Sequence, residues 1–206
     1  MFLILDFTQS LKMAILNNDN FIQKEIHTKK NISEILISEV EKFLKKSKIK
    51  IQNFKSIYII TGPGSFTGIR SALTFAKSLK LTMKLNLFGI SKFEIINYKL
   101  KINKFNQKRG IFLYYRENQF FFQKFEGYES VSEVRLINLD TEVLKYNNKS
   151  TYVYDNILLE NSLKDKIFEK KANYHLIEYN FTQIKEIIKN NIIDNVDPKP
   201  LYIRNY

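Results

Sequence analysis

The chain has 206 residues and a formal net charge of +12, and 44% of its residues are hydrophobic. This length allows one large domain or two small ones, and the apolar content excludes disorder along the whole chain. Cysteine is absent and the histidines are only His27 and His175, which excludes a disulfide scaffold, thiol catalysis and a thiolate metal site, so we expect no metal site in this chain.

The first hundred residues alternate apolar strand patterns with helical ones. The turn Asn17-Asn18-Asp19-Asn20 separates two of the strands, and Asn31 or Ser33 is available to cap the first helix. The expected elements are strands at 2–8, 10–16 and 21–27, a helix over 33–46, a strand at 56–60, a helix ending near 84, a strand at 85–90 and a helix over 91–100. This order predicts a ribonuclease-H-like half, a mixed sheet with covering helices.

The second half follows a polar, basic stretch at 99–109, so we predict two domains, 1–103 and 104–206, with the tail packing back. Pro198 and Pro200 exclude a helix near the end of the chain. The expected elements are an aromatic-rich hairpin at 111–115 and 119–125, strands at 136–139 and 152–154, a helix over 181–193 and an extended tail ending at 201–206.

The positive charge lies in the first half. Residues 1–110 carry 20 Lys and Arg against 7 Asp and Glu, whereas residues 111–206 carry 13 against 14. A basic half favours nucleic acid or an acidic protein as a partner. The chain nevertheless has 28 Lys and only 5 Arg beside abundant Ile and Asn, so a compositional bias accounts for much of the charge without a function.

The stretch from Thr61 to Arg70 is the most informative part of the sequence. It joins a strand to a helix, where free backbone N–H groups and the helix dipole favour an anion. The glycine spacing fits neither a Walker loop nor a dinucleotide fingerprint, and Ser65 lacks the flanking glycines of a nucleophile elbow, so Ser65 is expected to cap the helix. The motif loop comprises Gly62, Pro63, Gly64, Ser65, Phe66, Thr67, Gly68 and Arg70.

The helix that follows has a second face of small residues. Gly68, Ser71, Ala72 and Phe75 fall at intervals of three and four residues, and such a row lets another helix approach closely. Two explanations stay open at this point. The row either packs against the helix over 33–46 or forms an interface with a partner.

Four segments together resemble the bacterial TsaB (YeaZ) family, whose members are the non-catalytic partners of TsaD in making threonylcarbamoyladenosine in tRNA. The segments are Leu3-Ile4-Leu5-Asp6-Phe7-Thr8, Gly62 to Arg70, Gly89-Ile90-Ser91 and Pro200-Leu201-Tyr202-Ile203-Arg204-Asn205. They span the chain from end to end, while residues 104–196 match only loosely.

The resemblance implies an actin-like ATPase (ASKHA) fold of two ribonuclease-H-like halves. It also implies a heterodimer with TsaD through helices of the first half, with Gly68, Ser71, Ala72 and Phe75 at the interface, or a homodimer when the chain is alone. A TsaE-like ATPase then joins, tRNA is bound through the complex, and ATP and a metal belong to partner subunits, with no cofactor in this chain. The apolar run at the beginning of the sequence ends at Asp6, and no basic residues precede it, so it does not have the pattern of a signal peptide. We therefore expect a cytoplasmic protein with no membrane role.

Several positions depart from the family pattern. Asn31 stands where many relatives have His, Tyr114-Tyr115-Arg116 replaces an Asp-Ala-Arg-like run, and Gln119 replaces a Glu. These changes remove acidic groups that an ATPase of this fold would use for metal and phosphate, so they indicate a subunit without a catalytic role.

Three other functions remain as alternatives. A stand-alone actin-like ATPase or kinase would depend on Asp6, which lies on the opening strand where a metal ligand is expected. A peptidase, an older label of this family, would need a nucleophile, base and orienting group that these residues do not supply. A stand-alone RNA-binding module would use the basic half and would stack bases on the aromatic hairpin. Its aromatic residues are Tyr114, Tyr115, Phe120, Phe121 and Phe122, and half of them must belong to the core because consecutive residues of a strand point to both faces.

Overall fold

The computed structural model describes residues 1–102, 108–116, 119–138, 151–155, 174–177, 179–190, 193 and 197–201. Its contacts group the chain into two units. Unit 1 combines Met1–Lys92 with Phe181–Tyr202, and unit 2 combines Phe93–Asn180 with Ile203–Tyr206. The domain boundary expected between residues 103 and 104 stays a prediction, and the tail residues 202–206 lie outside the described part of the chain.

Unit 1 contains a five-stranded mixed sheet in the order β3-β2-β1-β4-β5. Its strands are β1 (Phe2–Asp6), β2 (Leu11–Asn17), β3 (Asn20–Ile26), β4 (Ser56–Ile60) and β5 (Asn86–Ile90). The first three form an antiparallel meander, while β4 pairs in parallel with β1 and β5 in parallel with β4. The parallel strands need crossover connections, and the two long helices of the unit supply them.

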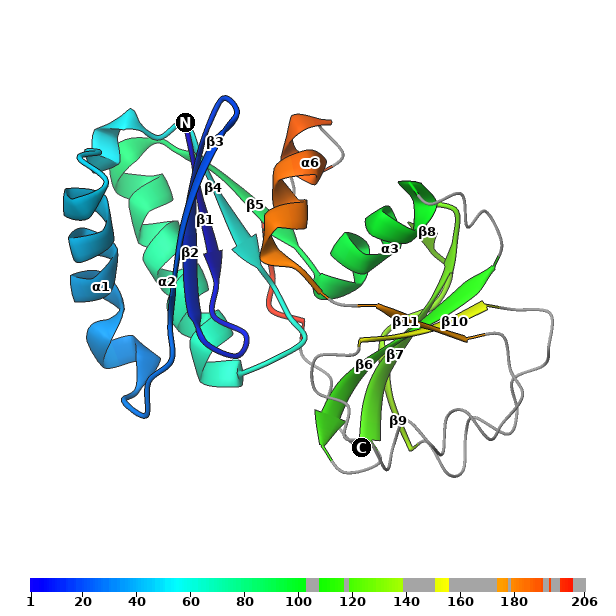
Figure 1. Ribbon diagram of the computed structural model, residues 1–206. Coiled ribbons are helices and arrows are strands. Elements are labelled where there is room, and N and C mark those ends of the chain that lie inside the picture. Colours follow the sequence, from blue (N-terminus) through cyan, green and yellow to red (C-terminus); the bar gives the residue numbers. More distant parts are fainter. Residues whose placement is uncertain are drawn as a thin grey trace. The chain divides into compact units, whose positions relative to one another are not determined.

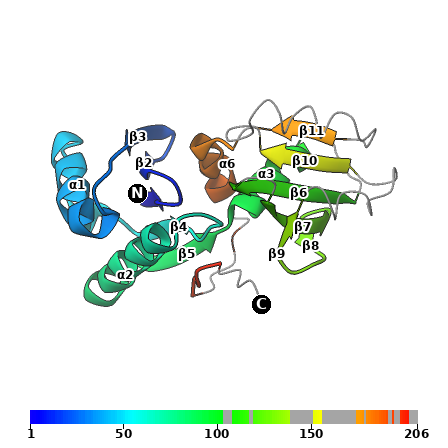
Figure 2. The same ribbon diagram turned by 90° about the horizontal axis from the view of Figure 1, so that it is seen from below.

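Helices cover both faces of this sheet (Figures 1 and 2). The helices α1 (Ile32–Lys46) and α2 (Phe66–Met83) pack on one face, and the short 3-10 helix η1 (Ile51–Asn53) lies in the connection between them. The opposite face carries α6 (Ile184–Lys189), which is preceded by η3 (Phe181–Gln183). The ring of Phe181 contacts that of Phe21 on β3 at a centroid distance of 6.2 Å, so a late segment of the chain completes the first sheet.

The element order predicted for the first hundred residues is confirmed, with one local correction there and one near the end of the chain. Asn31 occupies the N-cap position of α1, but its side chain does not cap the helix and instead donates from Nδ2 to Glu34 Oε1 at 2.8 Å. The helix expected over 181–193 is wrong in extent, because it begins as the 3-10 turn η3 and its α-helical part ends at Lys189.

Unit 2 contains a second mixed sheet in the order β11-β10-β6-β7-β8, with β9 also pairing with β7. Its elements are α3 (Lys92–Ile102), β6 (Arg109–Arg116), β7 (Gln119–Glu126), β8 (Glu129–Ser130), β9 (Arg135–Asn138), β10 (Thr151–Asp155) and β11 (Tyr174–Ile177). Asn97 of α3 donates from Nδ2 to the carbonyl oxygens of Gly127 and Tyr128 at 3.1 and 3.2 Å. This helix therefore contacts the second sheet, although the sequence pattern placed it in the first half.

Both units share one plan, in which an antiparallel hairpin is extended by two parallel strands on the outer side of its first strand. The prediction of two ribonuclease-H-like halves is thereby confirmed. Among the residues that the structure describes, no helix is both long and apolar enough to cross a membrane.

Candidate functional site

The motif loop is held in place by backbone hydrogen bonds from two other parts of unit 1. The carbonyl oxygen of Gly62 accepts from the N–H of Lys92 at 2.8 Å, just after β5. The carbonyl oxygen of Thr61 accepts from the N–H of Leu201 at 3.0 Å. Gly62 itself has a φ of +121°, a conformation that glycine adopts far more readily than other residues. The loop is therefore a fixed connection whose shape depends on the C-terminal segment.

Ser65 caps α2, as the sequence predicted. Its Oγ accepts from the backbone N–H of Gly68 at 3.2 Å, and its own N–H donates to the carbonyl oxygen of Thr8 at 2.7 Å. Both interactions satisfy backbone groups at the helix start. Ser65 is thus engaged in holding α2 against the turn after β1.

Two glycines of the motif permit a close approach between α2 and the end of β1. A Cβ on Gly68 would lie 2.0 Å from the carbonyl oxygen of Phe7, and one on Gly64 would lie 2.4 Å from Cβ of Thr8. No larger side chain fits at either position without moving the backbone. The glycine pattern that marked the loop in the sequence therefore serves the packing of the helix.

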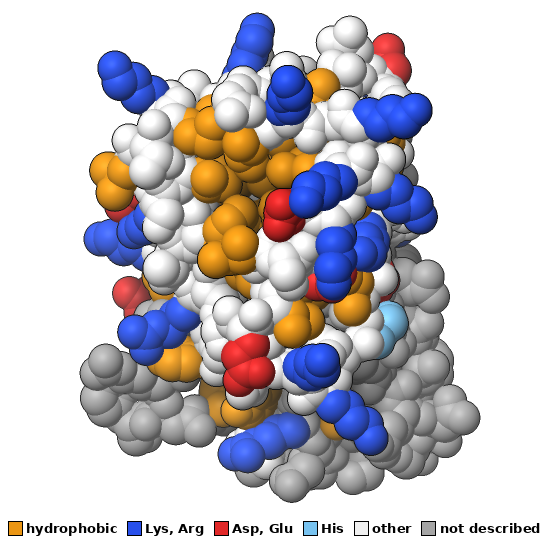
Figure 3. Space-filling model, turned by 90° about the vertical axis from the view of Figure 1, so that its left-hand side faces the viewer, with side chains coloured by type: hydrophobic (Ala, Val, Ile, Leu, Met, Phe, Trp, Pro, Cys, Tyr) orange, Lys and Arg blue, Asp and Glu red, His pale blue; other side chains and the backbone are white. Residues whose placement is uncertain are grey.

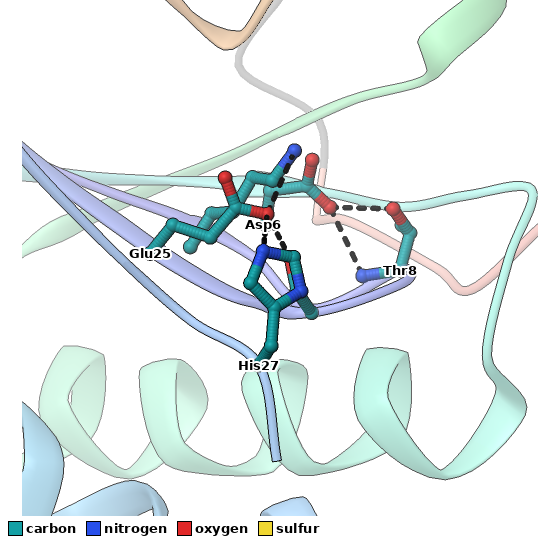
Figure 4. A network of polar contacts seen from close by, with 6 residues as sticks. Asp6, Thr8, Glu25 and His27 are labelled. Atoms are coloured by element: carbon teal, nitrogen blue, oxygen red, sulfur yellow. Dashed lines mark hydrogen bonds and ion pairs between the residues drawn. The ribbon is translucent and has the colours of Figure 1, made fainter. Parts of the chain in front are cut away.

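Asp6 lies at the end of β1 and is only 2% exposed. Its Oδ1 accepts from the backbone N–H of Thr8 at 3.0 Å and from Thr8 Oγ1 at 2.6 Å (Figure 4). This is the geometry of an aspartate that closes a tight turn by bonding to the backbone two residues on. These contacts engage Asp6 in the turn that joins β1 to β2.

Glu25 on β3 gathers polar partners in the same region (Figure 4). Its Oε1 accepts from Ser10 Oγ at 2.5 Å and lies 3.2 Å from Lys12 Nζ and 3.4 Å from His27 Nε2. Partial burial raises the pKa of Glu25, but the hydrogen bonds from Ser10 and Lys12 and the charges of Lys12 and His27 outweigh it, so this pKa lies below its ordinary value. Among the residues that the structure describes, no three His, Asp or Glu side chains are grouped so as to hold a metal ion.

A groove of about 500 Å³ runs between α1 and α2 on the outer side of unit 1 (Figure 3). Its lining combines apolar side chains with the hydroxyl groups of Ser and Thr. The lining residues are Ser33, Leu36, Ile37, Arg70, Ser71, Thr74, Phe75, Ser78, Leu79 and Thr82. We call this feature the α1–α2 groove. In Figure 3 it is a hollowed apolar patch with Lys and Arg side chains around it.

The structure places the four predicted interface residues at two depths. Ser71 and Phe75 line the α1–α2 groove and are partly exposed. Gly68 is buried against β1, and Ala72 is 0% exposed within the hydrophobic core. The small residues thus bring α2 close to the sheet and to α1, and only half of the predicted row reaches the surface.

The remaining motif residues lie at the start of α2. Phe66 is 54% exposed, and the guanidinium of Arg70 lies over its ring at 5.0 Å from the centroid. Arg70 also lines one end of the groove, whereas Pro63 is buried and Thr67 is exposed. The motif loop therefore borders the groove through Arg70 only.

The interface expected on the helices of the first half includes α1, but the sequence pattern singled out no residue of that helix. Ile37 is 69% exposed in the groove, and its neighbour Leu36 is 3% exposed at the floor. The available signal was that Ile37 falls outside the core-facing stripe of Leu36, Val40 and Phe43. An isoleucine on the polar side of an amphipathic helix indicates a contact beyond the helix's own core.

The aromatic hairpin of unit 2 is divided between core and surface, as expected. Phe120 and Phe122 are fully buried, whereas Tyr115 is 45% exposed and contacts Phe121 at a centroid distance of 4.9 Å. The guanidinium of Arg116 lies 5.2 Å from the centroid of Tyr115. Stacking of bases on this surface stays a prediction.

The amino-acid sequence is similar to a known protein family and to named relatives. The family model described as "TsaD: tRNA N6-adenosine threonylcarbamoyltransferase" matches residues 14–192. A relative from Buchnera aphidicola subsp. Schizaphis graminum, "tRNA threonylcarbamoyladenosine biosynthesis protein TsaB", is 31% identical over 150 residues, which cover 66% of this chain and 69% of the relative.

Solved structures show the same fold. YeaZ from Pseudomonas aeruginosa aligns with a TM-score of 0.66 at 10% identity and covers 99% of both chains. A Bacteroides thetaiotaomicron protein described as having an actin-like ATPase fold aligns with a TM-score of 0.57 at 11% identity and covers 91% of this chain and 95% of its own. The predicted actin-like fold is therefore confirmed.

Proposed function

The chain belongs to the TsaB (YeaZ) family, and from this premise we propose that it serves in the biosynthesis of tRNA threonylcarbamoyladenosine as a non-catalytic subunit that binds and supports a TsaD-like protein. The observation that carries the proposal is the α1–α2 groove. A subunit that acts by binding needs an apolar surface available to its partner, and this groove is such a surface.

The groove combines an apolar centre with a hydroxyl-rich border. Ile37 and Phe75 stand on its two sides, one on each helix, and Leu79 extends the apolar strip along α2. Each large apolar side chain that a partner covers contributes roughly 1.5–3 kcal/mol. Ser71, Thr74 and Ser78 offer hydroxyls for hydrogen bonds at the border. A partner presenting a helix or helix pair with apolar side chains matches this arrangement.

The other partners follow from the same role. In the absence of a TsaD-like protein, a second copy of this chain would cover the groove, so the homodimer and the heterodimer compete for one surface. A TsaE-like ATPase would join the heterodimer, and tRNA would be bound through the assembled complex. We assign ATP and metal to the partner subunits, no cofactor to this chain, and the cytoplasm as the location.

Charge introduced into the groove tests the interface. Phe75→Asp should abolish co-purification with the TsaD-like protein of the same genome, because a carboxylate cannot be buried unpaired in an apolar contact. Leu81→Asp is the matched control: Leu81 lies on the same helix, is 81% exposed and does not line the groove. Unchanged association of the Phe75→Asp protein, measured by light scattering, would contradict the proposed interface.

An assay of modified tRNA tests the role itself. Threonylcarbamoyladenosine should form only when both proteins are present, and the Phe75→Asp variant should lose it together with the complex. The rival is a stand-alone actin-like ATPase or kinase, favoured by the position of Asp6 at the end of β1. Mg-dependent ATP turnover by this chain alone, lost in Asp6→Ala, would establish that rival instead.

A further inference from the structure

One edge of unit 1 carries six exposed lysines of the basic first half. The parallel strands β1, β4 and β5 begin at this edge, where Lys55 N–H donates to the carbonyl oxygen of Met1 at 3.0 Å and Asn86 N–H donates to that of Lys55 at 3.1 Å. The helices α1 and α2 both end here (Figure 1). The exposed lysines of this edge, which we call the basic edge, are Lys45, Lys46, Lys48, Lys50, Lys55 and Lys84.

Little negative charge opposes these lysines. Lys45 pairs with Glu41 at 2.7 Å, and none of the other five forms an ion pair with a residue that the structure describes. The turn between β2 and β3 carries Asp19, which is already paired with Lys189.

Two lysines of this edge occupy backbone positions that favour other residue types. Lys48 and Lys84, just beyond the ends of α1 and α2, both have a φ of 55° in the left-handed region. Glycine and asparagine adopt this conformation most readily, and asparagine is frequent in this chain. The helix dipole accounts for Lys45 and Lys46 in the last turn of α1. It does not account for Lys50 and Lys55, which flank η1.

We propose that the basic edge binds the phosphate backbone of RNA, and that in the assembly proposed above this RNA is the tRNA. The inference rests on the proposed function for the identity of the RNA. Lysine presents a point charge without the forked geometry of arginine, so the contact would follow the backbone and not read the bases. The flanks of α1 and α2 line the groove while their ends carry the basic edge, so the two proposed surfaces share no residue.

The test compares two matched double variants of the full chain in binding fluorescent bulk tRNA across a salt series. K48N/K84N removes two charges from the basic edge, and K29N/K30N removes two exposed charges before α1, at the opposite end of the sheet. We expect K48N/K84N to weaken binding about tenfold at low salt and to reduce the salt slope by roughly 1–2, since each phosphate contact contributes about 0.9. K29N/K30N should change neither quantity appreciably.

Thermal stability separates binding from folding. Asparagine relieves the left-handed positions, so K48N/K84N should keep or raise the melting temperature while RNA affinity falls. Equal losses in the two double variants, or no loss in K48N/K84N, would overturn the inference. So would lysine-dependent binding to vesicles containing anionic lipid without binding to tRNA.

The outcome is independent of the interface with the TsaD-like protein. The Phe75→Asp chain should retain tRNA binding when it has lost the complex, and K48N/K84N should retain the complex when it has lost tRNA affinity. If the complex never forms but the basic edge still governs tRNA affinity, the proposed subunit role fails and the RNA surface stands. If the complex forms and K48N/K84N does not change its affinity for tRNA, the proposal of an RNA surface is wrong and the proposed subunit role stands.

Discussion

In unit 1 the first hairpin is joined to its helix by close backbone contacts, whereas in unit 2 the equivalent hairpin is held by aromatic rings. Gly68 lies directly against the carbonyl of Phe7 at the end of β1. In unit 2, Phe112 on β6 and Phe122 on β7 pack with ring centroids 4.6 Å apart. The two units share a strand order, but the contact in unit 1 depends on a glycine that has no side chain, whereas the contact in unit 2 depends on large aromatic rings. Close approach draws α2 tightly onto the sheet, and the outer flank of that helix lines the α1–α2 groove.

Gly68→Ala should have the largest effect on unit 1. The added Cβ would lie 2.0 Å from a backbone carbonyl, so α2 must move away from β1, and we expect a loss of more than about 4 kcal/mol in the free energy of unfolding. Gly127→Ala in unit 2 is the control. Gly127 has a φ of +63° with open space around it, so the cost should be about 1 kcal/mol from backbone strain alone. Similar urea midpoints for the two variants would show that the close approach is not what holds unit 1.

Phe122→Ala should have the largest effect on unit 2. Its side chain is 0% exposed, and its removal leaves a cavity beside Phe112, which costs about 3–5 kcal/mol. Phe122→Leu keeps much of the volume and should cost less than half as much. Thermal unfolding followed by circular dichroism measures both. Equal costs for the alanine and leucine variants would mean that the ring itself does not support the hairpin.

Glu25→Gln should have the smallest effect, confined to one side of the pH range. The pKa of Glu25 is lowered in the folded chain, so its contribution to stability is present above the ordinary carboxyl pKa and is lost as pH falls below about 4. The difference in melting temperature between Glu25→Gln and the unchanged chain should therefore shrink on acidification. Glu126→Gln is the control from unit 2, because the pair of Glu126 and Lys108 is 3.6 Å apart and largely exposed. A difference independent of pH would contradict the role of the carboxylate.

The sequence predicted the elements of unit 1 well because each is bounded by strong local signals. Turn residues separate the strands, and Ser65 caps α2 as its position after the glycines indicated. The small residues of α2 were harder to interpret. Periodicity shows that Gly68 and Ala72 share a side of the helix with Phe75, but it cannot show whether that side meets a sheet of the same chain or another protein. The answer depends on the depth of each residue, which only tertiary packing determines.

For a similar reason, the sequence pattern could not show which of the two sheets α3 contacts. Its pattern is helical whichever sheet it contacts, and the polar stretch after it suggested a boundary. The deciding contacts are those of Asn97 with Gly127 and Tyr128, which lie some thirty residues away. Likewise, Arg109 looked like part of a basic linker but is 2% exposed and donates to the carbonyl of Gly127 at 2.7 Å. Contacts with residues distant in the sequence decide the burial of such a charged residue, and they leave no periodic pattern.

Unit 1 is assembled from the two ends of the chain, and this has a consequence for its synthesis. A ribosome delivers β1 to β5 first, then Phe93–Asn180 of unit 2, and only afterwards α6 and the segment whose Leu201 bonds to Thr61. Until then one face of the first sheet lacks Phe181 and the motif loop lacks its last backbone partner. Domains often fold in the order in which they emerge, but here most of the second unit emerges before the first unit is complete. Truncation near residue 180 should therefore yield a nascent first unit that proteases digest readily, whereas the complete chain resists them.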